Sequence, residues 1–236
     1  MYFRALATDY DGTLAHDGIL DEATASALER LRYSGRRPIM VTGRELDDLI
    51  EVCPRLDLFD LVVAENGALL YDPESKEETL LAEPASAELI RKLEAAKVPG
   101  LSVGRAIVAT WEPYEVQVLE AIRELGLELQ IIFNKGAVMV LPSSVNKATG
   151  LAAALKRLDI EAKHVVGVGD AENDHAFIKT CGCAVAVANA IPALIKEADI
   201  ITEGERGAGV AELIDRMIAT DLQDISALHD RVRLAG

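Results

Sequence analysis

Positive charge is scarce in this sequence, and the shortage argues against one class of partner. Lys and Arg number 24 against 39 Asp and Glu, which gives 236 residues a formal net charge of −15. Nucleic-acid-binding proteins usually present a basic surface, so we expect no nucleic-acid partner. A small anionic substrate remains compatible with this charge, because a bound metal ion and a few local cations can reverse the field inside one pocket.

Long apolar runs and paired cysteines are also missing. No segment approaches the roughly 20 uninterrupted apolar residues of a membrane-spanning helix, and residues 1–8 lack the cleavage pattern of a secretory signal. The three cysteines fit neither a disulfide framework nor a zinc pattern. We therefore expect a cytoplasmic protein with reduced thiols and no membrane partner, either a monomer or a homodimer.

Short apolar runs alternate with helical patterns along most of the chain. This alternation is typical of an α/β fold, a Rossmann-like doubly wound parallel sheet covered by helices. It predicts a core built from residues 1–83 and 142–218. The expected strands cover residues 3–8, 38–41, 61–64, 164–169, 184–187 and 200–201.

The pattern changes between residues 84 and 141. Helices are expected over 85–97 and 115–125, a strand near 102–110, and a hairpin of strands 129–133 and 137–141 around an Asn-Lys-Gly turn. This segment is too rich in structure to be a loop, so we interpret it as an inserted α+β cap that governs substrate specificity.

The chain ends in a third kind of segment, residues 219–236. Apolar residues spaced three and four apart predict an amphipathic helix there. Such a helix either docks on its own domain or binds a partner, and the sequence leaves both open.

Polar residues gather where several of the predicted strands end. The carboxyl ends of parallel strands form the edge where open sheets bind ligands, and a helix start lies at the same edge. We therefore expect these residues to converge. They are Asp9, Asp11, Thr42, Gly43, Lys147, Asp170, Asn173 and Asp174.

These residue types suit the transfer of a phosphoryl group. The group is anionic and repels an anionic nucleophile, so its charge must be neutralised before attack. Mg²⁺ prefers oxygen ligands and supplies that neutralisation. Asp9 and Asp170, at neighbouring strand ends, are suited to place two carboxylates on one ion, with Asp174 nearby.

The remaining polar groups have complementary uses. Lys147 offers a compact positive charge for Asp9 and the phosphoryl group. Thr42 offers a hydroxyl donor, and Gly43 exposes a backbone N–H. Asp11, two residues after Asp9 on an irregular turn, is placed to act as general acid and then as base for water.

Four segments resemble, in order, the four motifs of the haloacid dehalogenase-like hydrolase superfamily. Two further segments, Glu65-Asn66-Gly67-Ala68 and Val187-Ala188-Asn189-Ala190, resemble the branch whose cap lies between the second and third motifs, subfamily IIB (Cof-type). The small cap is similar to that of archaeal-type phosphoglycolate phosphatases and sugar-phosphate phosphatases. The four motif segments are Asp9-Tyr10-Asp11-Gly12-Thr13, Thr42-Gly43-Arg44, Lys147 and Gly169-Asp170-Ala171-Glu172-Asn173-Asp174.

The resemblance implies a role for each matched position. Asp9 is implied to be the nucleophile and a metal ligand, and Asp11 the acid/base that also lends its backbone carbonyl to the metal. Asp170 is implied to bind Mg²⁺ directly, and Asp174 directly or through water. The residues implied or expected to contact the phosphoryl group or substrate are Thr42, Gly43, Lys147 and Asn173.

Aspartate at both Asp9 and Asp11 indicates phosphoryl transfer in this family, not carbon–halogen cleavage. The expected function is a Mg²⁺-dependent phosphatase that acts on a small phosphorylated metabolite, of phosphoglycolate or sugar-phosphate type, through an aspartyl-phosphate. A phosphotransferase or phosphomutase shares the first half-reaction. A receiver-like signalling module is disfavoured, because its acceptor aspartate follows a middle strand and it carries no cap.

Two smaller features stay open at this point. Arg44 is expected either to contact substrate or cap, or to form a structural ion pair. The Cys181-Gly182-Cys183 segment favours simple packing over redox chemistry.

Overall fold

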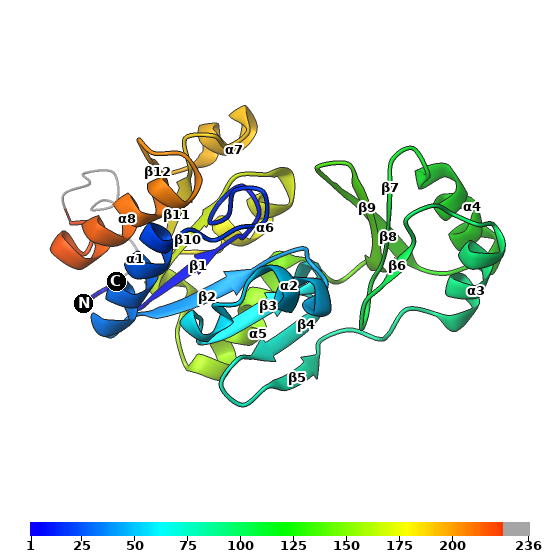
Figure 1. Cartoon of the computed structure of the whole chain (residues 1–236), viewed down its shortest axis with the longest axis horizontal. Helices are drawn as coiled ribbons and strands as arrows, with labels where there is room; N and C mark the ends of the chain where they lie inside the picture. Colours follow the sequence, from blue (N-terminus) through cyan, green and yellow to red (C-terminus); the bar gives the residue numbers. More distant parts are fainter. Residues whose placement is uncertain (224–236) are drawn as a thin grey trace.

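The computed structural model describes residues 1–223 and contains two separate sheets. The larger sheet has eight strands in the order β12-β11-β10-β1-β2-β3-β4-β5, and the smaller has four in the order β6-β7-β9-β8. Figure 1 shows the smaller sheet and its two helices at one end of the molecule, beside the larger sheet and its helices. The predicted α/β architecture is confirmed.

Six strands of the larger sheet are parallel. Most of their residues are fully buried, and helices cover the sheet, so these strands form continuous apolar runs. Two further strands extend the sheet beyond β3 and were not predicted: β4 (Leu69–Asp72) pairs antiparallel with β3, and β5 (Glu77–Leu80) pairs antiparallel with β4. The six are β1 (Ala5–Thr8), β2 (Arg37–Val41), β3 (Leu61–Ala64), β10 (Val165–Gly169), β11 (Cys183–Ala186) and β12 (Ile200–Ile201).

Within residues 1–223, six α-helices and four short 3₁₀ turns accompany this sheet. Helices α1 and α8 pack side by side, and α5 packs across β2, β3 and β4. The helices are α1 (Glu22–Tyr33), α2 (Leu46–Val52), α5 (Lys147–Leu158), α6 (His175–Ile178), α7 (Pro192–Glu197) and α8 (Arg206–Thr220). The 3₁₀ turns are η1 (Leu56–Leu58), η2 (Glu65–Gly67), η3 (Ala162–His164) and η4 (Glu172–Asp174).

The smaller sheet and its helices form the segment interpreted above as the cap. Helices α3 (Ala87–Ala95) and α4 (Glu115–Leu125) pack on one another and share a hydrophobic cluster with the sheet. Its strands are β6 (Ser102–Val103), β7 (Val108–Trp111), β8 (Leu129–Asn134) and β9 (Ala137–Pro142). The limits of core and cap at residues 83/84 and 141/142 stay a prediction.

One prediction for the cap was wrong. The single strand expected near residues 102–110 is two antiparallel strands, β6 and β7, joined by a tight turn in which Gly104 N–H bonds to the carbonyl of Ile107. The carboxylate of Glu65 in the core binds the backbone of this turn. The side-chain pattern of a strand does not reveal a partner that binds only the backbone, so the turn could not be predicted.

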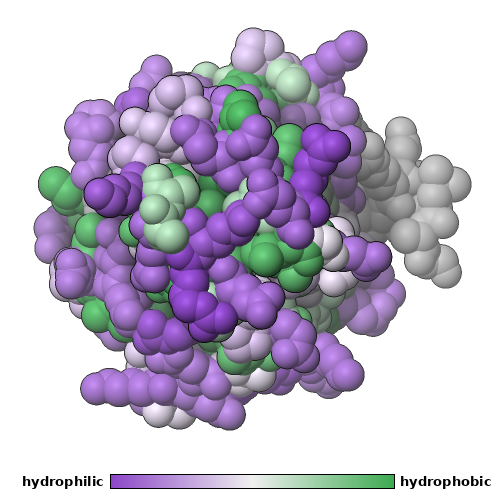
Figure 2. Space-filling model, turned by 90° about the vertical axis from the view of Figure 1, so that its right-hand side faces the viewer, coloured by the Kyte–Doolittle hydropathy of each residue, from purple (hydrophilic) through white to green (hydrophobic). Residues whose placement is uncertain are grey.

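The face of the molecule at the cap end is mainly polar (Figure 2). Viewed from the cap end, hydrophilic side chains cover most of the face and apolar groups appear as separate patches (Figure 2). Within residues 1–223, no helix combines the length and apolarity that crossing a membrane requires. The amphipathic helix predicted in residues 219–236 lies almost wholly outside the described residues.

The three cysteines are free thiols. Burial raises the pKa of Cys181 to about 12, which suppresses the reactive thiolate. Cys183 lies fully buried in β11. Packing is therefore the better account of this segment.

Candidate active site

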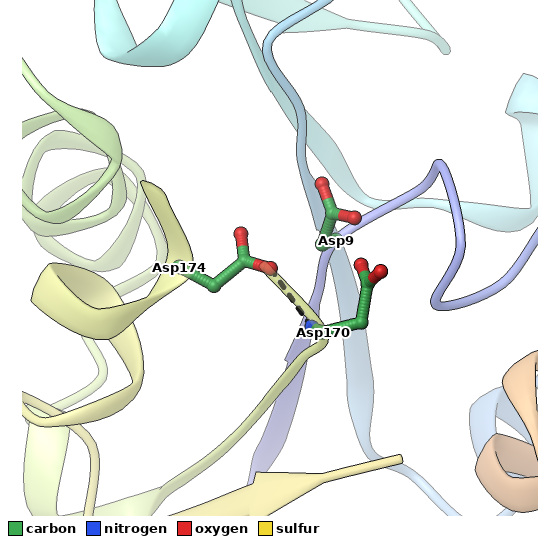
Figure 3. A group of neighbouring side chains, drawn as sticks. All are labelled: Asp9, Asp170 and Asp174. Carbon is green, nitrogen blue, oxygen red and sulfur yellow. Dashed lines mark hydrogen bonds between the residues drawn. The ribbon is translucent and has the colours of Figure 1, made fainter. Parts of the chain in front are cut away.

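Three buried aspartates form a cluster at the carboxyl edge of the larger sheet. Asp9 directly follows β1 and Asp170 directly follows β10, and these two strands pair in parallel with Thr8 opposite Val168. Asp174 belongs to the turn after Asp170. Figure 3 shows the carboxylates of Asp9 and Asp170 side by side, with Asp174 approaching from that turn. Each residue offers an oxygen within 4.8 Å of the others.

The turn after β10 is organised by the carboxylate of Asp174. Its Oδ2 accepts hydrogen bonds of 2.9 Å from the backbone N–H groups of Asp170 and Ala171. Gly169 makes this close packing possible, because a Cβ there would lie 2.6 Å from Cβ of Asp174. Asp174 therefore fixes the backbone that carries Asp170.

Lys147 supplies the buried positive charge of the cluster. It opens α5 next to the N-cap Asn146, whose capping box with Thr149 sets the helix start. Its side chain is 1% exposed, and Nζ lies 2.6 Å from Oδ1 of Asp9 and 2.6 Å from Oδ1 of Asp174. Burial opposes protonation of Lys147, but the carboxylates of Asp174 and Asp9 outweigh it and raise its pKa above the ordinary value. The residue is therefore an ammonium.

The cluster carries more negative than positive charge. Three carboxylates and the one buried ammonium of Lys147 leave a formal charge of −2. Burial, and then the charges of Asp174 and Asp170, raise the pKa of Asp9 to about 7 against the opposing effect of Lys147. A divalent cation would balance this excess and favour the ionised form of Asp9.

A cap lysine that the sequence did not single out already occupies part of this site. Nζ of Lys135, in the β8–β9 turn, donates to the backbone carbonyl of Asp11 and, at 2.9 Å, to Oδ2 of Asp170. The other oxygen of Asp170 accepts from Thr13 Oγ1 at 3.0 Å. The carbonyl of Asp11 and the carboxylates of Asp9 and Asp170 thus attract a cation, and such an all-oxygen set fits a hard divalent ion.

Asp11 points its carboxylate at Arg44. Arg44 donates from Nε at 2.6 Å and from Nη2 at 2.8 Å to Asp11, and from Nη1 at 2.5 Å to Asp48. These hydrogen bonds, led by those to Asp11, raise the pKa of the guanidinium further. Arg44 thus forms the ion pair that was one of its two expected functions, and it also lines the cavity between core and cap, so a contact with substrate stays a prediction.

A cavity of about 540 Å³ lies between the core and the cap, a size suited to a small ligand. Core residues Asp9, Asp11 and Gly43 form part of its wall. The cap contributes further lining residues, among them Ile107, Thr110, Trp111, Asn134, Lys135 and Met139.

Three of the four predicted contact residues, Thr42, Lys147 and Asn173, are not among the described residues of this wall. Thr42 is fully buried after β2, and its Oγ1 accepts the backbone N–H of Arg44 at 3.1 Å. Asn173 donates to Oδ1 of Asn66 at 3.3 Å, while its own Oδ1 is buried without a protein partner. The predicted contacts of Thr42, Lys147 and Asn173 to phosphate or substrate therefore stay predictions.

Glu65 has a function that the sequence did not reveal. Its fully buried carboxylate accepts backbone N–H groups of the cap turn: Arg105 at 2.7 Å, Ala106 at 2.8 Å and Ile107 at 3.2 Å. The sequence placed Glu65-Asn66-Gly67 directly after the strand expected at residues 61–64, and the structure has both Glu65 and Asn66 at positive φ. The sequence signal was the single ionisable side chain in residues 61–70.

Fold and site together define an α/β protein with a buried carboxylate–lysine cluster at the edge of its larger sheet, beside a smaller α+β unit. A family model described as haloacid dehalogenase-like hydrolase matches residues 6–98 and 111–214. The chain belongs to this family.

Individual relatives agree with this assignment. A phosphoglycolate phosphatase of Methanothermobacter thermautotrophicus is 33% identical over 224 residues, which cover 91% of this chain and 99% of the relative. Phosphoglycolate phosphatase 2 of Saccharolobus solfataricus is 30% identical, with 91% of this chain and 92% of the relative covered. A haloacid dehalogenase-like hydrolase from Bacteroides thetaiotaomicron superposes with a TM-score of 0.77 at 21% identity, covering 91% and 99%. The structure of a subclass IIB sugar phosphatase of the same superfamily superposes with a TM-score of 0.69 at 18% identity. The match covers 91% of this chain and 98% of that structure.

Proposed function

We propose that this chain is a Mg²⁺-dependent phosphatase that hydrolyses a small phosphorylated metabolite through an aspartyl-phosphate on Asp9. The observation that carries the proposal is the contact of the Lys147 ammonium with Asp9, inside a cluster of three buried carboxylates at the sheet edge. The names of the two relatives above make phosphoglycolate the first substrate to test.

Asp9 is the proposed nucleophile. Lys147 binds Oδ1, so the carboxylate is held against rotation and Oδ2 remains for attack on phosphorus. The new Oδ2–P bond forms as the bond from phosphorus to the alcohol oxygen of the substrate breaks. Mg²⁺, bound by Asp9, Asp170 and the carbonyl of Asp11 with Asp174 in support, would neutralise charge on the phosphoryl oxygens.

Asp11 is the proposed proton carrier. In the first step it would give a proton to the departing alcohol oxygen, and in the second it would take one from the water that attacks the aspartyl-phosphate. Its two hydrogen bonds from Arg44 keep the carboxylate at the cavity wall, where both the alcohol and the water must arrive.

The cap is proposed to determine substrate specificity. Its side chains complete the cavity of about 540 Å³ that Asp9 also lines, and Trp111, Thr110 and Met139 contribute to the wall. This volume suits a small phosphate ester. The residues that act in the chemistry come from the core, so the cap would set which alcohol the phosphate is attached to.

Steady release of inorganic phosphate tests the proposal. Purified protein with Mg²⁺ is offered phosphoglycolate, a panel of sugar phosphates and p-nitrophenyl phosphate, and the Asp9→Asn variant serves as the blank. Many turnovers with free phosphate as product support a phosphatase. Labelling of the protein followed by arrest would indicate a signalling module, and phosphate retained on an organic product would indicate a phosphotransferase or phosphomutase.

A further inference from the structure

Lys135 links the tip of the cap hairpin to the acidic cluster of the core. It sits in the turn between β8 and β9, and its side chain is 45% exposed on the cavity wall. Its ammonium bonds to the carbonyl of Asp11 and the carboxylate of Asp170. Gly12 leaves room for this approach, because a Cβ there would lie 2.5 Å from Nζ of Lys135 and 2.5 Å from Oδ2 of Asp170.

The two oxygens that Lys135 uses belong to the oxygen set suited to the divalent cation. An ammonium within hydrogen-bond distance of Asp170 Oδ2 and the Asp11 carbonyl fills the space in which a cation would contact both. Two positive charges side by side repel strongly in a partly buried site. Lys135 and the cation therefore cannot share these oxygens in the same geometry.

The cap has a second attachment that does not involve the cluster. The turn around Ala106 is bound by the buried carboxylate of Glu65, and Arg105 forms ion pairs with Asp47 and Glu78 of the core. Loss of the Lys135 contact would leave these bonds intact. The hairpin could then move while the cap stays attached at its other side.

We propose that Lys135 competes with the divalent cation for the oxygens of Asp11 and Asp170, so that cation binding releases the cap hairpin from the core. This inference rests on the proposed function for its cation site. Lys135 is a positioning residue in this scheme: it sets the hairpin position and weakens cation binding, and it takes no part in bond making or breaking.

Calorimetric titration with Mg²⁺ measures the competition directly. The protein is freed of metal with a chelator, and the wild type is compared with Lys135→Met. Lys92→Met, which removes a partly exposed cap lysine paired with Glu124, is the matched control. Removal of the competitor should tighten Mg²⁺ binding by about 3- to 10-fold, whereas Lys92→Met should bind like the wild type.

Amide hydrogen exchange over residues 129–142 supplies a readout of the hairpin itself. Mg²⁺ should speed exchange at the hairpin turn of the wild type, and Lys135→Met should exchange rapidly with or without Mg²⁺. Exchange around Ala106 should not change in either protein. Thermal melts of both variants in chelator verify that the fold is retained.

The outcomes separate this inference from the proposed function. The inference is wrong if Lys135→Met binds Mg²⁺ no more tightly than the wild type, or if Mg²⁺ does not change the hydrogen exchange rate of the wild-type hairpin. Either result counts against it even if the wild type hydrolyses phosphate esters. A wild-type protein that binds no divalent cation and releases no phosphate overturns both. Tighter binding together with a Mg²⁺-responsive hairpin supports the inference.

Discussion

The carboxylate of Glu65 in the core lies 2.8 Å from the backbone nitrogen of Ala106 in the cap and accepts its hydrogen bond. The same carboxylate accepts the N–H groups of Arg105 and Ile107. An ionised carboxylate offers only acceptors, so it matches three converging donors without a mismatch. Gly104 belongs to this arrangement, because a Cβ there would lie 2.7 Å from the Glu65 carboxyl carbon.

Glu65→Gln should loosen the cap attachment. The amide brings an NH₂ group against backbone N–H donors and leaves at least one of them buried without a partner, at a cost of about 1–3 kcal/mol. Urea unfolding measures this loss. A misplaced cap should also raise KM more than it lowers kcat. Glu78→Gln, which alters an exposed partner of Arg105, is the matched control; equal effects of the two substitutions would contradict a special function of Glu65.

Asp9→Asn should remove turnover and keep the fold. Loss of the proposed nucleophile should lower kcat by at least about 1,000-fold. The folded-state pKa of Asp9 is raised, to about 7, so in the absence of metal its ionisation costs stability as pH rises from about 4 through 7. The neutral amide lacks this cost, and Tm at pH 8 in chelator should equal or exceed that of the wild type. Substantial remaining phosphate release would exclude the covalent mechanism.

Lys147→Met should destabilise the protein and abolish activity. It leaves the buried carboxylates of Asp9 and Asp174 without their counter-ion, and breaking such a buried pair typically costs about 3–5 kcal/mol. Denaturant unfolding with phosphate release checks both effects. Lys163→Met, at an exposed lysine paired with Glu161, should stay within about 0.5 kcal/mol of the wild type. A variant as stable as this control would show that Lys147 is not needed to balance the cluster.

Removal of divalent ions should stop the reaction. The cluster has an excess of negative charge that repels an anionic phosphate ester, so EDTA should silence hydrolysis and Mg²⁺ should restore it. Thermal melting gives an independent measure, since a ligand that binds only the native state raises Tm with its concentration. Ca²⁺ serves as a comparison ion of equal charge and larger size. Full activity in EDTA would exclude the metal-dependent mechanism.

The convergence of Asp9, Asp170 and Lys147 at one sheet edge could be predicted because it depends on where individual strands end and where one helix begins. Asp9 and Asp170 each follow a parallel strand directly, and adjacent parallel strands end at one edge. Lys147 follows an Asn with a Thr three residues on, which is a readable helix start. These patterns need no knowledge of how distant parts of the chain are oriented.

Contacts between the cap and core could not be predicted in this way. The hairpin around Lys135 was predicted, but which turn side chain reaches Asp170 depends on the placement of the whole cap. The link between Glu65 and the cap could not be found from the sequence, because its partners are backbone amides, which have no sequence signature. The antiparallel pair β4–β5 was missed because β5 is short and largely exposed, so it shows little hydrophobic patterning.

Residues 84–141, the proposed cap, lie between β5 and α5 in the chain, and this position has an evolutionary consequence. The proposed nucleophile, proton carrier, buried lysine and metal ligands all lie outside residues 84–141, and the ladder of the eight-stranded sheet does not pass through that segment. The insert can therefore diverge in sequence, or be exchanged, while the chemistry is inherited unchanged. Glu65 and Gly12 in the core limit which inserts are compatible with it. Any replacement must still offer backbone amides to Glu65 and a hairpin that packs closely against Gly12.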